Sequence, residues 1–438
     1  MCIRCSSLAR QYRNYSFQPI GSLHTLMSSL SAVLSFNNKP VHGEKNFVLL
    51  PDGGIGHGVG SGLGVWCRGL PCESGAGPMG RVSQVQDAGR GVGRREVHQR
   101  LELLQRLPRH PEFRREARLP PQVAHHWSGP MSVALFAAGD EEFALLQGYV
   151  KYLRRCFAPI SERVAFHVLF PGSRMPSNSS AKELARLLKW RSAELKSWRM
   201  RNPYPQNILR NLARKNCHTD YVFLLDVDVI PSRDLAQGLD AFLRRSPRCP
   251  RCAYVVPTYE IDNRAHFPKN KPDLVRLVRK GLAQPFHHKI FIYNQYATNF
   301  SSSVVTNQNS GCISEPDFLS RRDEFEFLYE PFYVAPDDVP PHNEKFIGYG
   351  YTRNTQVYEM FVAGYKFKVL SPVFTCHWGL EKKHKWPPWR ERQNYANRAI
   401  FEVFKREIFA RYQKDPLNMI KRAPTVSRIA VSKFRSKT

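Results

Sequence analysis

The sequence predicts an α/β fold in which helices flank a mostly parallel sheet. From Trp127 onward, apolar strand-like segments alternate with amphipathic helix-like segments, as in βαβ units. The strand-like segments are almost continuously apolar, which is typical of parallel strands that are buried on both faces. The chain has 438 residues, of which 42% are hydrophobic, and this is enough for one large or two ordinary domains.

Hydrophobic periodicity places the first elements of this fold in the region that follows Trp127. Apolar runs of strand length alternate there with helical repeats, and Pro205 stands near the start of one helix. The expected order is strand 131–139, helix 141–157, strand 164–170, helix 181–200, helix 205–216, strand 221–229 and helix 235–245.

The second half of the chain has a looser pattern, although strand and helix signals recur in it. We expect a strand at 253–261, a helix at 273–283, a strand at 367–374 and a long helix at 389–412. The last residues are rich in Lys and Arg, so 413–438 is predicted to be a basic tail beyond the globular unit at 127–412.

Residues 1–126 differ in composition from the rest of the chain. One part is rich in Gly and another in Arg, and the Gly-rich part has no periodicity that could bury a face. We therefore expect this region to be mostly disordered, with one short helix near residues 96–106.

The net charge of +28 calls for an anionic partner or substrate. Lys and Arg are spread along the chain and are not interleaved with stacking aromatic residues, so a nucleic-acid-binding protein is the weaker alternative. The chain has ten cysteines, including the CxxC pairs Cys2/Cys5 and Cys249/Cys252. No histidine lies near either pair, so each is predicted to be ordinary thiols or a local disulfide rather than a zinc site.

Asp226 and Asp228 end the apolar run of the expected strand 221–229. Side chains at i and i+2 of a strand point to the same face, and open α/β sheets bind ligands at the carboxyl ends of their strands. Two carboxylates that converge there repel each other unless a cation compensates them. Mg²⁺ or Mn²⁺ would do so and would bridge to phosphates, which indicates a nucleotide or nucleotide-sugar enzyme. The alternative is a solvated Asp-rich turn that caps the next helix.

The segment YVFLLDVDVIPSRDL, residues 221–235, resembles the D-x-D segment of inverting glycosyltransferases of the glucuronyltransferase kind. The chain is similar to the beta-1,4-glucuronyltransferase 1 family, glycosyltransferase family 49, from about Trp127 to Tyr412. It also resembles the second catalytic domain of the dystroglycan xylosyl/glucuronyl polymerase. The further segments that carry the resemblance, in the family's order, are 204–215, 254–261, 267–275, 297–301, 329–335, 343–354 and CHWG at 376–379.

The resemblance implies a GT-A fold, UDP-glucuronate as the donor and Mn²⁺ as the cofactor. The implied acceptor is a xylose-ended glycan that receives a β-1,4 linkage, as in O-mannosyl glycan elaboration of dystroglycan-type acceptors. Asp226 and Asp228 match the family's metal-binding acids, and His377 matches the late histidine that completes the metal coordination.

The donor carboxylate and the acceptor hydroxyl each require a partner in the protein. Lys271 and Arg353 lie in matched segments and are the candidate cations for the carboxylate, although each could be a surface cation. Inversion requires a base that takes the proton of the attacking hydroxyl. Glu330 is the candidate base, with Glu344 and Asp338 as rivals.

The family resemblance also implies the Golgi lumen, a type II membrane anchor, and a homodimer or association with other Golgi glycosyltransferases. No stretch of the sequence reaches the roughly 20 apolar residues of a membrane span, so either the chain is a variant or residues 1–126 are not the native start. Sequons occur at Asn14, Asn178 and Asn299, and Asn299 lies in a matched segment. Residues 302–325 depart from the family pattern, which leaves a catalytically silent glycosyltransferase-like partner as an alternative.

Overall fold

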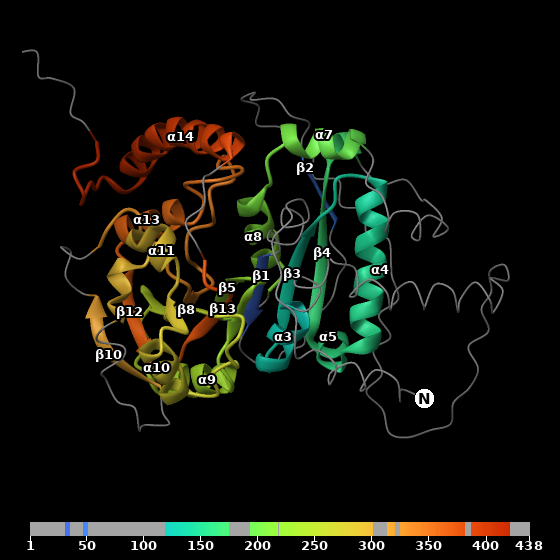
Figure 1. Cartoon of the computed structure of the whole chain (residues 1–438). Helices are drawn as coiled ribbons and strands as arrows, with labels where there is room; N and C mark the ends of the chain where they lie inside the picture. Colours follow the sequence, from blue (N-terminus) through green and yellow to red (C-terminus); the bar gives the residue numbers. More distant parts are fainter. Residues whose placement is uncertain are drawn as a thin grey trace, which may run out of the picture.

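A computed structural model describes residues 31–35, 47–50, 119–174, 193–217, 219–300, 313–319, 325–381 and 387–420 of the chain. These residues form a mixed α/β structure with two sheets flanked by helices (Figure 1). The predicted helix at 96–106, most of the atypical segment 302–325 and the end of the basic tail lie outside the described residues.

The larger sheet has nine strands and crosses the middle of the molecule (Figure 1). Strands such as β3 and β5 are buried along almost their whole length, because helices cover both faces of the sheet. In spatial order the strands are β10 (Ser314–Leu319), β12 (Lys366–Ser371), β7 (Cys252–Val255), β11 (Tyr333–Pro336), β5 (Tyr221–Asp226), β1 (Ser31–Ser35), β3 (Met131–Phe136), β4 (Val164–Pro171) and β2 (Phe47–Leu50).

The strand directions are mixed, which corrects the expectation of a mostly parallel sheet. β3 pairs in parallel with β4, and β7 with β12, but β11 is antiparallel to both β5 and β7. β1 likewise runs antiparallel to β3 and β5. The prediction rested on apolar strands that are separated by helices, and the strands of this kind, β3, β4, β5 and β7, do run in one direction. It could not see the reversed strands that the tertiary structure inserts between them.

A smaller four-stranded sheet lies beside the larger one. Its order is β6 (Val229–Pro231), β13 (Thr375–Trp378), β8 (Thr258–Ile261) and β9 (Ala283–Pro285). β13 pairs antiparallel with β6 and parallel with β8, so His377 stands opposite both Val229 and Glu260. This register brings residues that are more than a hundred positions apart in the sequence to one place.

The expected strand 253–261 is two strands in different sheets. β7 ends at Val255 and β8 begins at Thr258, and Pro257 lies between them. Pro257 has no N–H to donate to a ladder, whereas its carbonyl accepts from the amide of Thr375 at 2.9 Å. The continuous apolar run concealed this change of sheet.

Helices cover the faces and ends of both sheets (Figure 1). α8 carries its apolar residues on the side that is buried against the large sheet, and α9 does the same with Leu235, Leu239 and Phe242. The helices are α3 (Leu119–His126), α4 (Asp140–Cys156), α5 (Ala158–Arg163), α7 (Ala193–Arg201), α8 (Gln206–Lys215), α9 (Leu235–Arg245), α10 (Lys271–Arg279), α11 (His288–Phe291), α13 (Asn354–Val362) and α14 (Pro388–Tyr412), with short 3₁₀ turns η4 (Gly172–Arg174), η6 (Ile292–Asn294) and η7 (Tyr296–Thr298).

The folded unit begins before the predicted boundary at residue 127. Val123 and Ala124 of α3 are buried in the same apolar cluster as Trp127, and Arg163 Nη2 donates to the carbonyl of Ala124 at 2.9 Å. β1 and β2, which lie in the region expected to be mostly disordered, pair with the large sheet. At the other end α14 stops at Tyr412, and Gln413 takes a left-handed conformation with φ 52°.

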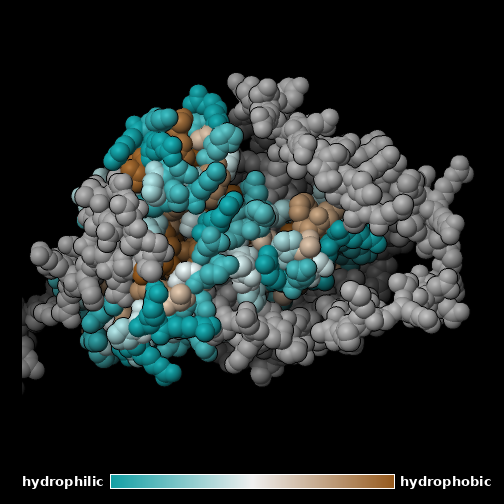
Figure 2. Space-filling model, turned by 90° about the horizontal axis from the view of Figure 1, so that it is seen from below, coloured by the Kyte–Doolittle hydropathy of each residue, from teal (hydrophilic) through white to brown (hydrophobic). Residues whose placement is uncertain are grey.

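Most of the described surface on one face is hydrophilic, and hydrophobic residues gather in a smaller area between the polar ones (Figure 2). None of the helices in the described part of the chain is long and apolar enough to cross a membrane.

Candidate active site

The two aspartates of the D-x-D segment lie on either side of the end of β5. Asp226 is the last residue of that strand, and Asp228 lies in the turn before β6. The expectation that both occupy one face of a single strand is therefore wrong. Because the chain turns after Asp226, the two carboxylates have different partners.

Asp228 faces His377. Its Oδ2 lies 3.5 Å from His377 Nε2, and the pairing of β6 with β13 produces this approach. His377 Nδ1 lies 3.3 Å from the carbonyl of Gly379. A proton on Nδ1 that is donated to this carbonyl leaves a lone pair on Nε2 directed toward the carboxylate, an arrangement that a cation stabilises.

The Asp228–His377 pair fits a divalent cation in its chemistry. Carboxylate oxygen and imidazole nitrogen both suit Mn²⁺, and two ligands of one ion, each roughly 2.1 Å from it, can stand 3.5 Å apart. Asp226 does not complete a site of three. Among the residues that the structure describes, no group of three His, Cys, Asp or Glu side chains is arranged to hold a metal ion.

Asp226 is paired with two arginines. Arg353 Nη2 donates to its Oδ1 at 2.8 Å, and Arg210 Nη2 lies 3.5 Å from the same oxygen. Both guanidinium groups are buried, and Arg353 lies over the ring of Phe332 at 4.4 Å. Burial and the neighbouring Arg353 lower the pKa of Arg210. The carboxylate of Asp226 thus lies against two buried cations.

The two cations predicted for the donor carboxylate, Lys271 and Arg353, contact different residues. Arg353 donates to Asp226, as above. Lys271, at the start of α10, is buried with its Nζ 3.3 Å from the hydroxyl of Tyr259, and burial lowers its pKa to about 8. Neither is a surface cation, so that alternative reading is wrong for both.

Glu330, the candidate base, is half-buried and is held from one segment. Asn294 Nδ2 donates to its Oε2 at 3.3 Å, and its backbone amide donates to the carbonyl of Asn294 at 2.8 Å. Gln295 Nε2 donates to its carbonyl at 2.8 Å. The charge of Glu330 raises the pKa of Arg210, although burial dominates the shift of that group. The carboxylate therefore lies close to the arginine pair of Asp226.

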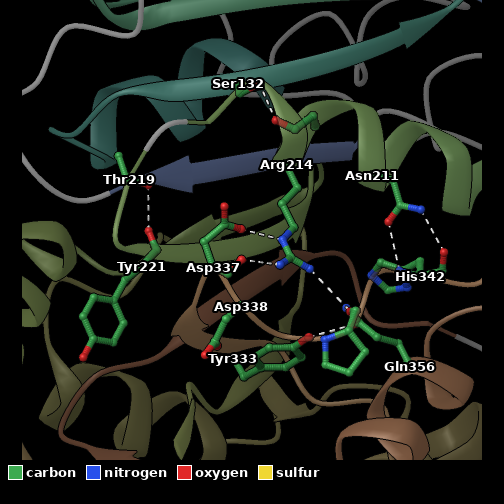
Figure 3. Close-up of polar contacts among 12 residues, drawn as sticks. Ser132, Asn211, Arg214, Thr219, Tyr221, Tyr333, Asp337, Asp338, His342 and Gln356 are labelled. Carbon is green, nitrogen blue, oxygen red and sulfur yellow. Dashed lines mark hydrogen bonds and ion pairs between the residues drawn. The ribbon is translucent and has the colours of Figure 1, made fainter. Parts of the chain in front are cut away.

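The rival bases make contacts elsewhere. Asp338 accepts from the hydroxyl of Tyr365 at 3.1 Å, and Glu344 is exposed and accepts from Asn211 at 2.8 Å. Figure 3 shows Asp338 and Asn211 among the polar residues around Arg214.

Arg214 and Asn211 of α8, the helix that also carries Arg210, make several contacts with segment 337–342. Arg214 donates to Asp337 Oδ1 at 2.5 Å, and Asn211 exchanges two hydrogen bonds with the backbone of His342 (Figure 3). Burial and the charges of Arg210 and Arg353 lower the pKa of His342 well below its ordinary value. A neutral imidazole therefore packs among the arginines.

Three site residues were missed from the sequence: Glu260, His287 and Glu381. Glu260 is buried and accepts from Gln284 Nε2 at 2.6 Å and from the amides of His287 and Glu381 at 2.8 and 3.0 Å. Burial raises its pKa. His287 Nε2 lies 3.5 Å from Glu381 Oε2, and its Nδ1 accepts from Asn294 at 2.9 Å. The only available signal was that Glu260 lies in the matched segment 254–261.

Asn299, the predicted glycosylation site, is exposed at the end of η7 in a left-handed conformation with φ 47°. Cys249 and Cys252 form a disulfide, as one of the two readings of this CxxC pair predicted.

Comparison with known proteins bears on the whole of the folded unit. The family described as "Glycosyl-transferase for dystroglycan" matches residues 117–413. Beta-1,4-glucuronyltransferase 1 of Homo sapiens is 34% identical over 309 residues, which cover 67% of this chain and 72% of that protein. The protein of that name from Danio rerio is 29% identical over 313 residues, which cover 67% of this chain and 71% of that protein. Xylosyl- and glucuronyltransferase LARGE1 of Homo sapiens is 24% identical over 299 residues, 66% of this chain and 33% of that protein.

Proposed function

The chain belongs to the glycosyltransferase family for dystroglycan, and from this membership we propose that it transfers glucuronate from UDP-glucuronate to a xylose-ended glycan, with inversion and a β-1,4 linkage. The relatives named beta-1,4-glucuronyltransferase 1 support glucuronyl transfer. The observation that carries the proposal is the Asp228–His377 pair at the end of β5, where a nucleotide-sugar enzyme needs a cation.

Asp228 and His377 are the residues that would hold Mn²⁺. When bound there, the ion would neutralise charge on the donor diphosphate as UDP departs. Arg210 and Arg353 lie at the end of β5, and guanidinium groups there suit an anionic donor. Lys271 and Arg353 are the proposed partners of the donor carboxylate. To bind it, Lys271 would exchange its contact with Tyr259, and Arg353 would share its contact with Asp226.

Glu330 is the proposed base. Asn294 donates to one of its carboxylate oxygens, which orients the other. The carboxylate of Glu330 takes the proton of the acceptor hydroxyl as the hydroxyl oxygen attacks the sugar carbon and UDP leaves.

We also propose that the protein works in the Golgi lumen. The Cys249–Cys252 disulfide supports this compartment, because disulfides persist where the environment is oxidising. The exposure of Asn299 agrees with a glycoprotein that passes through the secretory route.

The experiment that tests the function measures glucuronyl transfer to a xyloside against Mn²⁺ concentration, with EDTA as the metal-free arm. Asp228→Asn should lower turnover by a factor of about 100 or more, since it removes a charged ligand of the ion. His377→Ala should weaken Mn²⁺ binding, measured by calorimetry, and excess metal should partly restore its activity.

Asp240→Asn on the exposed face of α9 is the matched control and should behave as the wild type. Full transfer in EDTA, or by Asp228→Asn, would mean that Asp228 and His377 hold no catalytic metal ion. Absence of transfer by a folded wild type that binds Mn²⁺ and UDP-glucuronate would favour the catalytically silent partner.

A further inference from the structure

Loop 347–351, which comes just before Arg353, is clamped against helix α14. Asn397 of that helix is buried, and its Nδ2 donates to the carbonyls of Ile347, Tyr349 and Gly350 at 3.0, 3.1 and 2.8 Å. Gln393 Oε1 accepts from the amide of Tyr349 at 2.9 Å. These four hydrogen bonds from one helix set the position of Tyr349.

Two glycines in this loop cannot be replaced by other residues without backbone strain. Gly348 and Gly350 have φ values of 79° and 89°, in the region that favours glycine. A Cβ at Gly350 would lie 2.2 Å from Asn394 Oδ1, and a Cβ at Gly348 would lie 2.6 Å from Gln393 Oε1. The loop therefore lies against the side chains of α14, with the tyrosine between the two glycines.

Tyr349 is half-buried and stacks with Arg390 of α14. The Cζ atom of Arg390 lies 3.7 Å from the centroid of the tyrosine ring. Trp389, the preceding residue, is 43% exposed. An aromatic ring beside a guanidinium offers an apolar surface for the C–H face of a sugar and N–H donors for its hydroxyl groups.

The stacked pair lies beside the proposed base. Phe327, three residues before Glu330, has its ring centroid 6.1 Å from that of Tyr351. Phe332, two residues after Glu330, lies under Arg353 at 4.4 Å, so the segment that carries Glu330 runs along the loop that carries Tyr349. In agreement with this, burial raises the pKa of Tyr349 most, Arg390 lowers it, and the charges of Glu330 and Glu381 raise it. Glu330 and Glu381 are themselves linked through Asn294 and His287. The base must touch the acceptor hydroxyl, whereas the Asp228–His377 pair belongs to the donor side. A sugar-binding surface next to Glu330 is therefore on the acceptor side.

We infer that Tyr349 and Arg390, held by the clamp of α14, form the acceptor subsite and bind the terminal sugar ring of the glycan. The inference rests on the proposed function, because it takes Glu330 as the base. It assigns the recognition of the acceptor to an aromatic–guanidinium pair that comes from the segments around 349 and 390, and not to the D-x-D region.

The test compares the full-length wild type with Tyr349→Ala, Tyr349→Phe and Arg390→Met, each checked for an unchanged melting transition. We expect Tyr349→Ala and Arg390→Met to raise the acceptor KM about tenfold or more, with the KM for UDP-glucuronate within about twofold of the wild type. Tyr349→Phe keeps the ring and should retain most of the acceptor affinity. Tyr395→Ala, also on α14 and 78% exposed, is the matched control and should leave both constants unchanged.

Binding of methyl β-xyloside, followed by ligand-observed NMR without turnover, separates this inference from the function. A wild type that binds the xyloside through Tyr349 but transfers nothing would refute the function and support the subsite. Normal transfer with an unchanged acceptor KM in Tyr349→Ala and Arg390→Met would overturn the subsite and leave the function standing. A rise in the donor KM alone would also overturn it, since the pair would then serve UDP-glucuronate.

Discussion

At the scale of single residues, the two aspartates of the D-x-D segment differ in what surrounds them. Asp226 lies against two buried guanidinium groups, whereas Asp228 faces one histidine at 3.5 Å. The same residue type two positions apart therefore has a structural partner in one case and a ligand-like partner in the other.

Asp226→Asn and Asp228→Asn should consequently differ in stability. Loss of the Asp226 charge leaves Arg210 and Arg353 buried and uncompensated, so the free energy of unfolding should fall by about 1–3 kcal/mol. Asp228→Asn should leave the metal-free protein closer to the wild type, because Asp228 faces a histidine at 3.5 Å whereas Asp226 compensates two buried arginines. Thermal denaturation in EDTA measures both. Equal losses of stability would contradict the division of roles.

Lys271 allows a prediction about pH. Burial lowers the pKa of Lys271 from 10.5 to about 8, so between these values the unfolded chain binds more protons than the folded protein. The contribution of this group therefore makes the wild type more stable as the pH rises from 8 to 10.5. Lys271→Met should stabilise the protein by about 3 kcal/mol below pH 8, and the gain should vanish toward pH 10.5.

Chemical denaturation of the wild type and Lys271→Met across that range measures the difference. A gain that does not depend on pH would show that the charge of Lys271 is not what costs stability. The KM for UDP-glucuronate of the same variant reports separately whether Lys271 binds the donor carboxylate, because a purely structural lysine would leave this constant unchanged.

At the scale of elements, the contact of loop 347–351 with α14 is the feature most sensitive to a single methyl group. Gly350 and Gly281 both have positive φ, 89° and 67°, but a Cβ at Gly281 would meet nothing within 4 Å. Gly281→Ala should therefore cost only the backbone strain, about 1–2 kcal/mol.

Gly350→Ala should cost the same strain and a further 1–3 kcal/mol or so, because its Cβ would displace Asn394. Urea denaturation of the two variants gives the comparison. If they lose the same free energy of unfolding, the loop is not held against α14 as described. The acceptor KM should rise with Gly350→Ala and stay unchanged with Gly281→Ala.

At the scale of the whole molecule, α3 is part of the folded unit, which therefore extends before Trp127. Val123 is buried in the cluster that also contains Trp127, and His125 on the same helix is exposed. Val123→Ala should lower the free energy of unfolding by about 1–3 kcal/mol, and His125→Ala should have little effect.

The two α3 variants are compared by thermal denaturation of the full chain. A Val123→Ala protein with wild-type stability would place the boundary back at residue 127. The family match from residue 117 agrees with the earlier start.

Much of the architecture follows from periodicity alone. Residues 221–226 form a strand, residues 206–215 and 235–245 form helices, and α14 covers 388–412 close to its expected bounds. These elements are long or strongly patterned, and local spacing of apolar residues is sufficient to define them. The order of the matched motifs likewise determined the family, which the comparisons confirm.

The family resemblance placed His377 and Asp228 in one candidate site, although their meeting depends on a strand pairing that joins residues 229 and 377. Spacing could not reveal that the apolar run through residues 253–261 divides between two sheets, or that reversed strands separate the parallel ones. Both are decided by which strands pair, and pairing is a property of segments distant in the sequence.

The sequence by itself thus determined the class of fold, the family and the residue types of the site. Only the tertiary structure decided which partner each of them has: arginines for Asp226, histidine for Asp228, asparagine for Glu330 and a buried tyrosine for Lys271. The physical reason is that charge and polarity are compensated at distances of a few ångströms in space. The groups that come within such distances here are separated by 12 to 149 positions in the sequence.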